Sequence, residues 1–249
     1  MADIEVFGIK SMPEIQPGDP LADIICAALD RTGLELREWD VLVVTQKVVS
    51  KAEGRLVRLS EVVPSPFAMS VAWEVQRDPR IVELVLREAK RIVKMDKGVI
   101  ITETHHGFVC ANSGVDKSNV EPGLVTLLPL DPDASARRIR ERIRQLKGVW
   151  VAVVVTDTWG RPWRNGLVNS AIGCSGIAPI KSYAGKKDPY GYVLNVTELA
   201  VVDEIAAIAE LAMGKLSGIP AVIVRGCEYE PANVGVKELL RTAESDLFR

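Results

Sequence analysis

The 249-residue sequence lacks the short motifs that mark many nucleotide-binding and hydrolytic enzymes. It has no G-x-x-x-x-G-K-[ST] phosphate loop, no G-x-G-x-x-G turn, no H-E-x-x-H zinc motif and no G-x-S-x-G nucleophile motif. Histidine is scarce, since His105 and His106 are the only two. A Ser-His-Asp hydrolase would need one of them as its base, and the hairpin tip predicted for this segment is a poor place to preorganise a base, so the sequence disfavours this class. Zinc catalysis is disfavoured as well.

Cysteine, net charge and long apolar runs are also limited. The four cysteines form no C-x-x-C pair and have no histidine at ligand spacing, so we expect reduced thiols in the core at Cys26, Cys110, Cys174 and Cys227. A formal net charge of -2 gives no general attraction to nucleic acid or to an anionic membrane. No segment approaches the roughly 18 apolar residues of a membrane span, and the N-terminus does not resemble a signal peptide. We therefore expect a soluble cytoplasmic protein that binds neither nucleic acid nor membrane.

What the sequence does contain is 47% hydrophobic residues, enough for a well-filled core. Apolar patterns predict strands at 4–9, 40–46 and 149–155, helices at 20–32 and 131–148, and a helix, turn and strand over 201–226. Helical spacing over 65–95 is interrupted at 77–80, where Asp78 and Pro79 predict the start of a second helix. Residues His106 and Gly107 are predicted at a hairpin tip.

The order of these elements bears on the fold class and on the domains. Strands and helices follow no strict β-α-β rhythm, so we expect an α+β or mixed α/β fold rather than a Rossmann fold or a barrel. No linker or repeat divides the chain. We therefore treat residues 1–249 as a single catalytic unit, because any division into lobes leaves no boundary in the sequence.

The first candidate site is TDTWGRPWRNG, which follows the apolar run 151–155. Asp157 would sit at the strand end, beside oxygens of Thr156 and Thr158, and hard divalent cations prefer such ligands. Arg161 and Arg164 carry forked donors that suit phosphate or carboxylate. The alternative for Asp157 is that it only caps a turn.

The glycine, proline and tryptophans of the same segment predict its shape. Gly160 and Pro162 predict a restricted loop between the polar residues. Trp159 and Trp163 either pack this loop onto its own domain, which the pattern favours, or stack on a planar ligand.

Three further segments carry polar side chains near predicted strands. Asp116 in ANSGVDKSN would complete a two-carboxylate metal site with Asp157, if the loops meet, or would form a solvated Asx turn. Lys47 and Lys51, four residues apart, would neutralise phosphate or simply be solvated. The turn MGKLSGIP, with Lys215, could bind anions through backbone N–H groups.

Taken together, these segments resemble a known family. GIKSMPEIQPGD, TQKVVSKAEG, ANSGVDKSN, VVVTDTWGRPWRNG and AELAMGKLSGIPAVIVRG are similar, in order and spacing, to the coenzyme F420-0:L-glutamate ligases, the archaeal γ-glutamyl ligases. The resemblance covers essentially the whole chain and fits the archaeal stand-alone form, without an added nitroreductase-like domain. It implies a family-specific fold that has neither a P-loop nor a Rossmann motif, and an intertwined homodimer.

The resemblance also implies an activity and its cofactors. The family is an acid–amino-acid ligase (peptide synthase): it uses GTP to join L-glutamate to coenzyme F420-0 and then adds a second, γ-linked glutamate, releasing GDP and phosphate through an acyl phosphate. It requires Mn²⁺ or Mg²⁺, expected as two ions, and K⁺ assists. Its partners are therefore F420-0, L-glutamate and GTP.

Site residues follow from the same resemblance, position by position. Asp116, Asp157 and Thr158 match metal ligands. Arg161 and Arg164 are the candidate catalytic residues on their own chemistry, as donors to phosphate and to a tetrahedral oxyanion. Nucleotide contacts are implied for Met12, Pro13, Glu14, Ile15, Gln46, Lys47, Lys51, Asn119, Met213, Gly214, Lys215, Leu216, Ser217, Gly218, Ile219 and Pro220. Relatives often carry glutamine as a metal contact where this chain has Lys215; because a cation cannot ligate a metal, we expect Lys215 to meet phosphate.

Two other classes remain open from the residues alone. A metal-dependent phosphatase or nucleotide hydrolase would use the same aspartates and basic residues, but would release phosphate without an amine acceptor. A nucleic-acid-binding module could use tryptophan and arginine for stacking and phosphate contacts, although the charge disfavours it.

Overall fold

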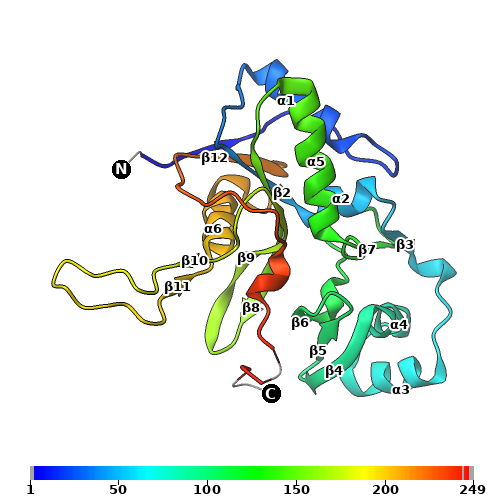
Figure 1. The fold of residues 1–249 in the computed structure, drawn as a ribbon. Helices are drawn as coiled ribbons and strands as arrows, with labels where there is room; N and C mark the ends of the chain where they lie inside the picture. Colours follow the sequence, from blue (N-terminus) through cyan, green and yellow to red (C-terminus); the bar gives the residue numbers. More distant parts are fainter. Residues whose placement is uncertain (1–2, 243, 247–249) are drawn as a thin grey trace.

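The protein is described here by a computed structural model of residues 3–242 and 244–246. Its main sheet has five strands in the order β1-β12-β2-β8-β9 (Figure 1). Strands β2 and β8 are parallel, and the other neighbouring pairs are antiparallel. The strands are β1 (Glu5–Gly8), β2 (Val41–Thr45), β8 (Ala152–Arg161), β9 (Arg164–Ser175) and β12 (Ala221–Arg225). The mixed α/β fold and the predicted strands are confirmed.

Helices cover both faces of this sheet. The side chains of Val41–Val44 and Val222–Val224 are all fully buried, so neither face of the central strands meets solvent. Helices α1 (Leu21–Thr32) and α5 (Pro132–Lys147) lie on one side, and α6 (Val201–Met213) lies on the other (Figure 1). The result is a three-layer core around the central strands.

Capping residues fix where the helices begin and end. The Asp131 side chain accepts a hydrogen bond from the N–H of Ala134 at 2.9 Å, and Pro132 opens α5 with a fitting φ. Helix α1 ends at Gly33, whose φ of 66° lies in the left-handed region that favours glycine. These ends agree with the sequence prediction.

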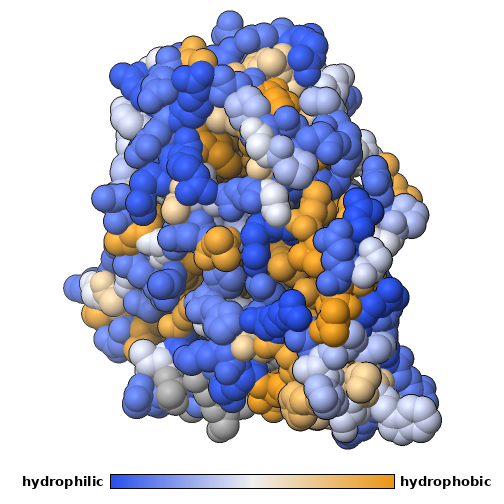
Figure 2. All heavy atoms as spheres, turned by 90° about the vertical axis from the view of Figure 1, so that its right-hand side faces the viewer, coloured by the Kyte–Doolittle hydropathy of each residue, from blue (hydrophilic) through white to orange (hydrophobic). Residues whose placement is uncertain are grey.

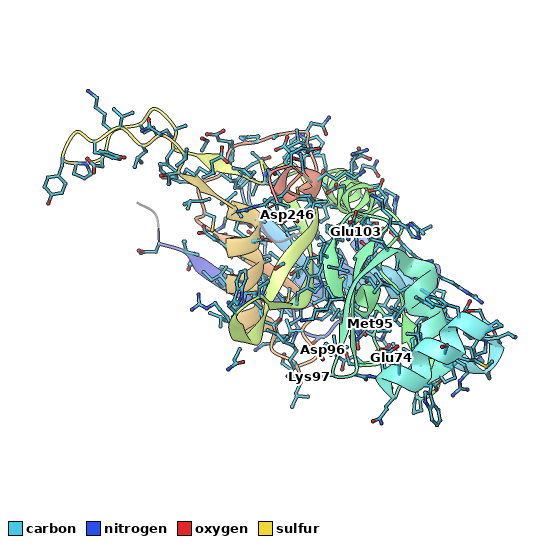
Figure 3. The ribbon with its side chains drawn as sticks, turned by 90° about the horizontal axis from the view of Figure 1, so that it is seen from below. Glu74, Met95, Asp96, Lys97, Glu103 and Asp246 are labelled. Carbon is cyan, nitrogen blue, oxygen red and sulfur yellow. The ribbon has the colours of Figure 1, made fainter. Side chains whose placement is uncertain are left out.

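A second group of elements packs beside the sheet. It comprises α3 (Pro66–Val75), α4 (Pro79–Glu88) and a three-stranded sheet of β4 (Ala89–Asp96), β5 (Val99–Thr104) and β6 (Val109–Ala111). Asp78 caps α4 as predicted. Helical structure stops at residue 88, however, so the prediction of helix up to 95 is wrong. The β4–β5 tip, with Asp96 and Lys97, lies beside Glu74 of α3 (Figure 3).

Short elements complete the chain. His106 and Gly107 lie in the turn between β5 and β6, as predicted. The remaining elements are α2 (Gln46–Ala52), β3 (Leu56–Arg58) paired with β7 (Leu124–Thr126), and the 3-10 turns Leu59–Glu61, Asn112–Gly114 and Val236–Leu239. Strands β10 (Lys181–Ser182) and β11 (Glu198–Leu199) form the base of an arm, residues 181–199, that extends away from the sheet in two views (Figures 1 and 3).

The cysteines and the membrane prediction can be checked against the fold. All four cysteines are free; three are buried, and Cys227 is half-buried. Burial raises the pKa of Cys26 to about 11 and those of Cys110 and Cys174 to about 12, which keeps these thiols protonated and inert. Within the described residues, every helix is too short or too polar to cross a membrane. The cytoplasmic location stays a prediction.

The segment TDTWGRPWRNG is a hairpin and not the predicted loop. Strand β8 continues through Asp157 to Arg161, and β9 returns from Arg164, so only Pro162 and Trp163 separate the two strands. Backbone pairing between β8 and β9 keeps Asp157 to Arg161 extended, although Gly160 and Pro162 predicted an irregular loop. The prediction that Asp157 ends a strand is therefore wrong, although β8 does lose its neighbour β2 just before it.

A buried ion pair joins Asp40, the residue before β2, to Arg225, the last residue of β12. Arg225 donates to both carboxylate oxygens of Asp40, at 2.8 and 2.7 Å, and also to the carbonyl of Glu35. Asp40 is fully buried and accepts the N–H of Arg37 as well. This forked pair satisfies charges that would otherwise be costly inside the protein.

We expect Asp40→Ala to lower the free energy of unfolding by about 3 kcal/mol, because it leaves Arg225 without its buried partner. The matched control is Asp30→Ala, which removes the exposed pair with Lys147 and should cost less than about 1 kcal/mol. Urea unfolding followed by circular dichroism measures both. Equal losses in the two variants would contradict this role for Asp40.

Candidate active site

The site lies where two parallel strands of the main sheet stop being neighbours. Thr45 of β2 pairs with Thr156 of β8, and this is the last pair in their ladder. The next residues are Gln46, which begins α2, and Asp157, which continues β8. Parallel register thus brings the start of α2 to Asp157 at the carboxyl edge of the sheet.

Asp157 is held by an aromatic neighbour. One carboxylate oxygen accepts the indole N–H of Trp159 at 2.9 Å, and the Trp159 ring packs on Phe108 with centroids 5.3 Å apart. Packing of Trp159 onto its own domain is therefore confirmed. Burial raises the pKa of Asp157 above its usual value, and the nearby charge of Asp116 adds to the increase.

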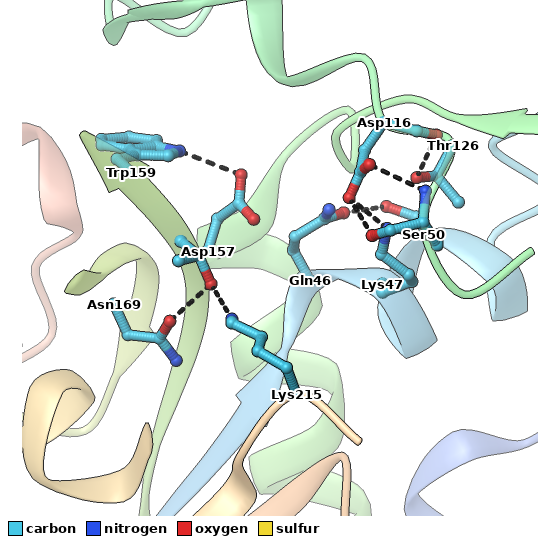
Figure 4. A network of polar contacts seen from close by, with 11 residues as sticks. Gln46, Lys47, Ser50, Asp116, Thr126, Asp157, Trp159, Asn169 and Lys215 are labelled. Carbon is cyan, nitrogen blue, oxygen red and sulfur yellow. Dashed lines mark hydrogen bonds and ion pairs between the residues drawn. The ribbon is translucent and has the colours of Figure 1, made fainter. Parts of the chain in front are cut away.

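Asp116 reaches the site from the second group of elements. Its backbone bridges to Thr126, and its carboxylate accepts a hydrogen bond from the Lys47 ammonium (Figure 4). The carboxylate also accepts from the N–H (2.8 Å) and the hydroxyl (2.7 Å) of Ser118. Burial pushes the pKa of Asp116 upward, but the bonds from Lys47 and Ser118 outweigh it, so the net pKa is lowered. Asp116 thus forms the predicted Asx turn, and the metal site that it would complete with Asp157 stays a prediction.

The lysines of α2 are not solvated. The side chain of Lys47 is 13% exposed and binds Asp116 and the Ser118 carbonyl, while Lys51 is 8% exposed and pairs with Glu14. The Lys51–Glu14 pair ties the segment 12–15 to α2. The interpretation of Lys47 and Lys51 as solvated charges is therefore wrong.

Thr158 faces away from the two carboxylates. Successive side chains of a strand point to opposite faces, so Thr158 lies across β8 from Asp157. Its hydroxyl donates to the amide oxygen of Asn169 on β9 at 2.6 Å and accepts from the ammonium of Lys215. Lys215 also pairs with Glu210 of α6 at 3.0 Å. The turn 213–220 is thus joined to β8 through Lys215 (Figure 4).

The candidate arginines stand apart from this cluster. Arg161 and Arg164 pair across the hairpin tip, four positions beyond Asp157, and both are exposed. At about 3.3 Å per residue this separation is roughly 13 Å along the strand. Trp163, in the turn between them, is 80% exposed. Asn119 is exposed too, next to Ser118.

The donor set at the two carboxylates suits one divalent cation. Asp116 lies in the segment after β6, and Asp157 lies on β8. Burial is the main cause of the raised pKa of Asp157, and the charge of Asp116 adds to it, so a cation between the two carboxylates would relieve repulsion. Among residues 3–242 and 244–246, His, Cys, Asp and Glu form no cluster of three or more that could hold a metal. Further ligands would therefore come from backbone, substrate or water oxygens. Thr158 instead meets an ammonium group.

Asn169, Glu210 and Ser118 contribute polar contacts that sequence reasoning missed. Asn169 gave a weak sign in the sequence, as a polar residue in the run LVNSAIG. In the structure it lies opposite Thr158 in the β8–β9 pairing. Glu210 gave none, because one acid in a helix is ordinary. Both gain their importance only from register and helix packing.

Surface hollows lie elsewhere. A cavity of about 360 Å³ between α1, α2 and α5 has apolar walls from Leu21, Val49 and Ile139. On its rim, Arg138 pairs with Glu53 and Arg142 with Asp23. Figure 2 views the side of the molecule that is on the right in Figure 1, and its upper part shows a hollow with a hydrophobic floor and a hydrophilic rim. Its charged rim groups are already paired with one another, and the hollow lies outside the carboxylate cluster.

The chain is similar in sequence to known proteins over almost its whole length. The profile of the F420-0:Gamma-glutamyl ligase family matches residues 8–226. Proteins named Coenzyme F420:L-glutamate ligase are similar over almost their whole length: 44% identity in Methanothermobacter thermautotrophicus (99% of both chains), 45% in Methanopyrus kandleri (100% of both) and 41% in Methanocaldococcus jannaschii (99% of this chain and 97% of that one). The chain belongs to the F420-0:γ-glutamyl ligase family.

Proposed function

We propose that this protein uses GTP to join L-glutamate to coenzyme F420-0 and then adds a second, γ-linked glutamate. The observation that carries the proposal is the pair Asp116 and Asp157, set beside Lys47 where β2 and β8 separate. Membership in the ligase family and the relatives' names supply the substrates.

An acyl phosphate accounts for the need for a nucleotide. A carboxylate is a poor acyl donor because its oxygen is a poor leaving group. Transfer of the γ-phosphoryl group of GTP to the F420-0 carboxylate would release GDP, and attack by the glutamate amine would then form the amide and release phosphate. Phosphoryl transfer depends on positioning and charge neutralisation, so no nucleophile from the protein is required.

The chain's own residues divide into binding roles in this proposal. Lys47 neutralises phosphate oxygens near Asp116, and the Lys51–Glu14 pair fixes the segment 12–15 for contact with the nucleotide. Contacts from Gln46, Asn119 and the turn 213–220 stay predictions. Arg161 and Arg164, at the hairpin tip, would bind an anionic part of the F420-0 substrate away from the reacting phosphoryl group.

Mn²⁺ or Mg²⁺ would be held by Asp116 and Asp157. Its role would be to neutralise the negative charge of the phosphate groups. K⁺ is proposed as an activating ion. The raised pKa of Asp157, which burial causes, supports a site arranged for a cation.

We also propose a homodimer that uses the arm 181–199. Tyr190 is 97% exposed, and Tyr192 and Val196 are exposed beside it on a segment that extends from the sheet (Figure 1). Apolar side chains on an extended arm are commonly buried by a partner. Light scattering of the intact protein should give twice the mass of one chain. A variant that lacks residues 184–196 should give the mass of one chain. A monomeric intact protein would contradict the dimer.

The function is tested by measuring phosphate release from GTP with Mn²⁺, with and without F420-0 and L-glutamate. We expect release only when both acceptors are present, together with products heavier by one and then two glutamyl units in mass spectrometry. Release without acceptors would indicate a nucleotide hydrolase instead. Adenosine triphosphate in place of GTP tests the base preference.

Asp157→Asn should lower turnover more than about 100-fold, because the amide is a weaker cation ligand. In the absence of metal the same variant should unfold at a higher temperature. The pKa of Asp157 is raised in the folded state because the carboxyl group is buried. The free energy of unfolding therefore falls as pH rises past the ordinary aspartate pKa, because the buried group must then ionise. Asparagine carries no charge and avoids this loss.

Asp30→Asn, far from the site in the exposed pair with Lys147, is the control and should leave turnover unchanged. Calorimetry without metal and an assay with Mn²⁺ measure the two properties. Full turnover in Asp157→Asn would exclude the assigned role.

A further inference from the structure

Across β8 from the carboxylate pair lies a second group of polar side chains, built around Lys215. The Lys215 ammonium lies 3.0 Å from a Glu210 carboxylate oxygen and donates to the hydroxyl of Thr158. These three residues come from the turn after α6, from α6 and from β8. Figure 4 shows Lys215 pointing toward the strand that carries Asp157 and toward Asn169.

Asn169 determines which way the Thr158 hydroxyl points. Asn169 is 2% exposed; its amide N–H donates to Glu210 at 2.9 Å, and its amide oxygen faces Thr158 at 2.6 Å. The reversed amide would place oxygen against the carboxylate of Glu210, so the observed orientation is fixed. An amide oxygen only accepts, so Thr158 must donate its single proton to Asn169.

The Thr158 hydroxyl therefore presents lone pairs on its other side. The donation from Lys215 to the same oxygen agrees with this assignment, because an ammonium group can only donate. One carboxylate oxygen of Glu210 and the lone pairs of Thr158 together form a set of oxygen ligands for a cation. We name this set, Thr158 and Glu210 with Asn169 behind them, the cation seat.

We propose that Lys215 fills the cation seat with its own ammonium group, so that the chain holds one divalent ion, at Asp116 and Asp157, and not two. The inference rests on the proposed function for the identity of the first ion. It replaces the second ion expected from resemblance by a charge that is part of the chain. A tethered ammonium supplies one positive charge at every metal concentration, whereas a bound ion must be captured from solution.

The test is the stoichiometry of Mn²⁺ binding, measured by the electron paramagnetic resonance signal of free Mn²⁺ in buffer free of K⁺. Wild type should bind one ion per chain. Lys215→Ala opens the cation seat and should bind two, the second one more weakly. Lys215→Ala combined with Glu210→Gln keeps the amide contact to Asn169 but removes the carboxylate, and should bind one again.

Other outcomes overturn the inference. Two ions bound by wild type would show that Lys215 does not fill the seat, and one ion bound by Lys215→Ala would show that Thr158 and Glu210 attract no cation. Lys215 is exposed, so its replacement is compatible with folding, which circular dichroism checks. A Lys215→Arg variant, which keeps the charge, should still bind one ion.

The proposed function is judged separately by Asp157→Asn. If this variant keeps the wild-type ion, the carboxylate site is wrong. The seat is then judged only by whether Lys215→Ala gains an ion over wild type. A gain supports the seat in either case, and the absence of a gain overturns it.

Discussion

The parallel pairing of β2 and β8 is the constraint on which the site depends. Its ladder ends at Thr45 and Thr156, and from there β2 turns into α2 while β8 stays paired with β9. A shift of one residue in this register would turn Asp157 to the other face of β8 and exchange it with Thr158.

Strand β9 adjusts to this change of neighbour by a bulge. Val155 pairs with Gly173 while Thr156 pairs with Ala171, so Ile172 is an extra residue at the point where β8 stops pairing with β2. Asp203 of α6 accepts the N–H of Ala171 at 2.7 Å and so holds the bulge. Beyond the bulge, the β8–β9 hairpin carries Asp157 and Thr158 on opposite faces. Asp157 accepts from Trp159, and Thr158 contacts Asn169 and Lys215.

Much of the fold was predictable because local signals were strong. Asp78 with Pro79 and Asp131 with Pro132 marked helix starts through caps, and apolar runs marked the buried strands. The hairpin at Arg161 and Arg164 was missed because Gly160 and Pro162 predict a loop, whereas pairing with β9 decides the structure. Pairing is a long-range property that local composition does not contain.

The site was predictable in its residue types and only in part in its arrangement. Asp116 and Asp157 were candidates from their positions after apolar runs, but their approach depends on how the segment after β6 packs beside β8. The ion pairs of Lys47 and Lys51 could not be predicted for the same reason. Asn169 and Glu210 gave little or no local signal, since their roles follow from the hairpin register and from the packing of α6 against β9.

The two sides of the site also differ in how firmly they are joined. Asp157 and Thr158 belong to one strand, and Glu210 lies on a helix packed on the same sheet, so the cation seat is built from elements of the main sheet and its helix. Asp116 comes from the segment after β6, and its approach to Asp157 relies on Phe108 against Trp159 and on Lys47. A cation held by Asp116 and Asp157 would therefore add a link between the two groups of elements, whereas Lys215 adds its charge inside one of them.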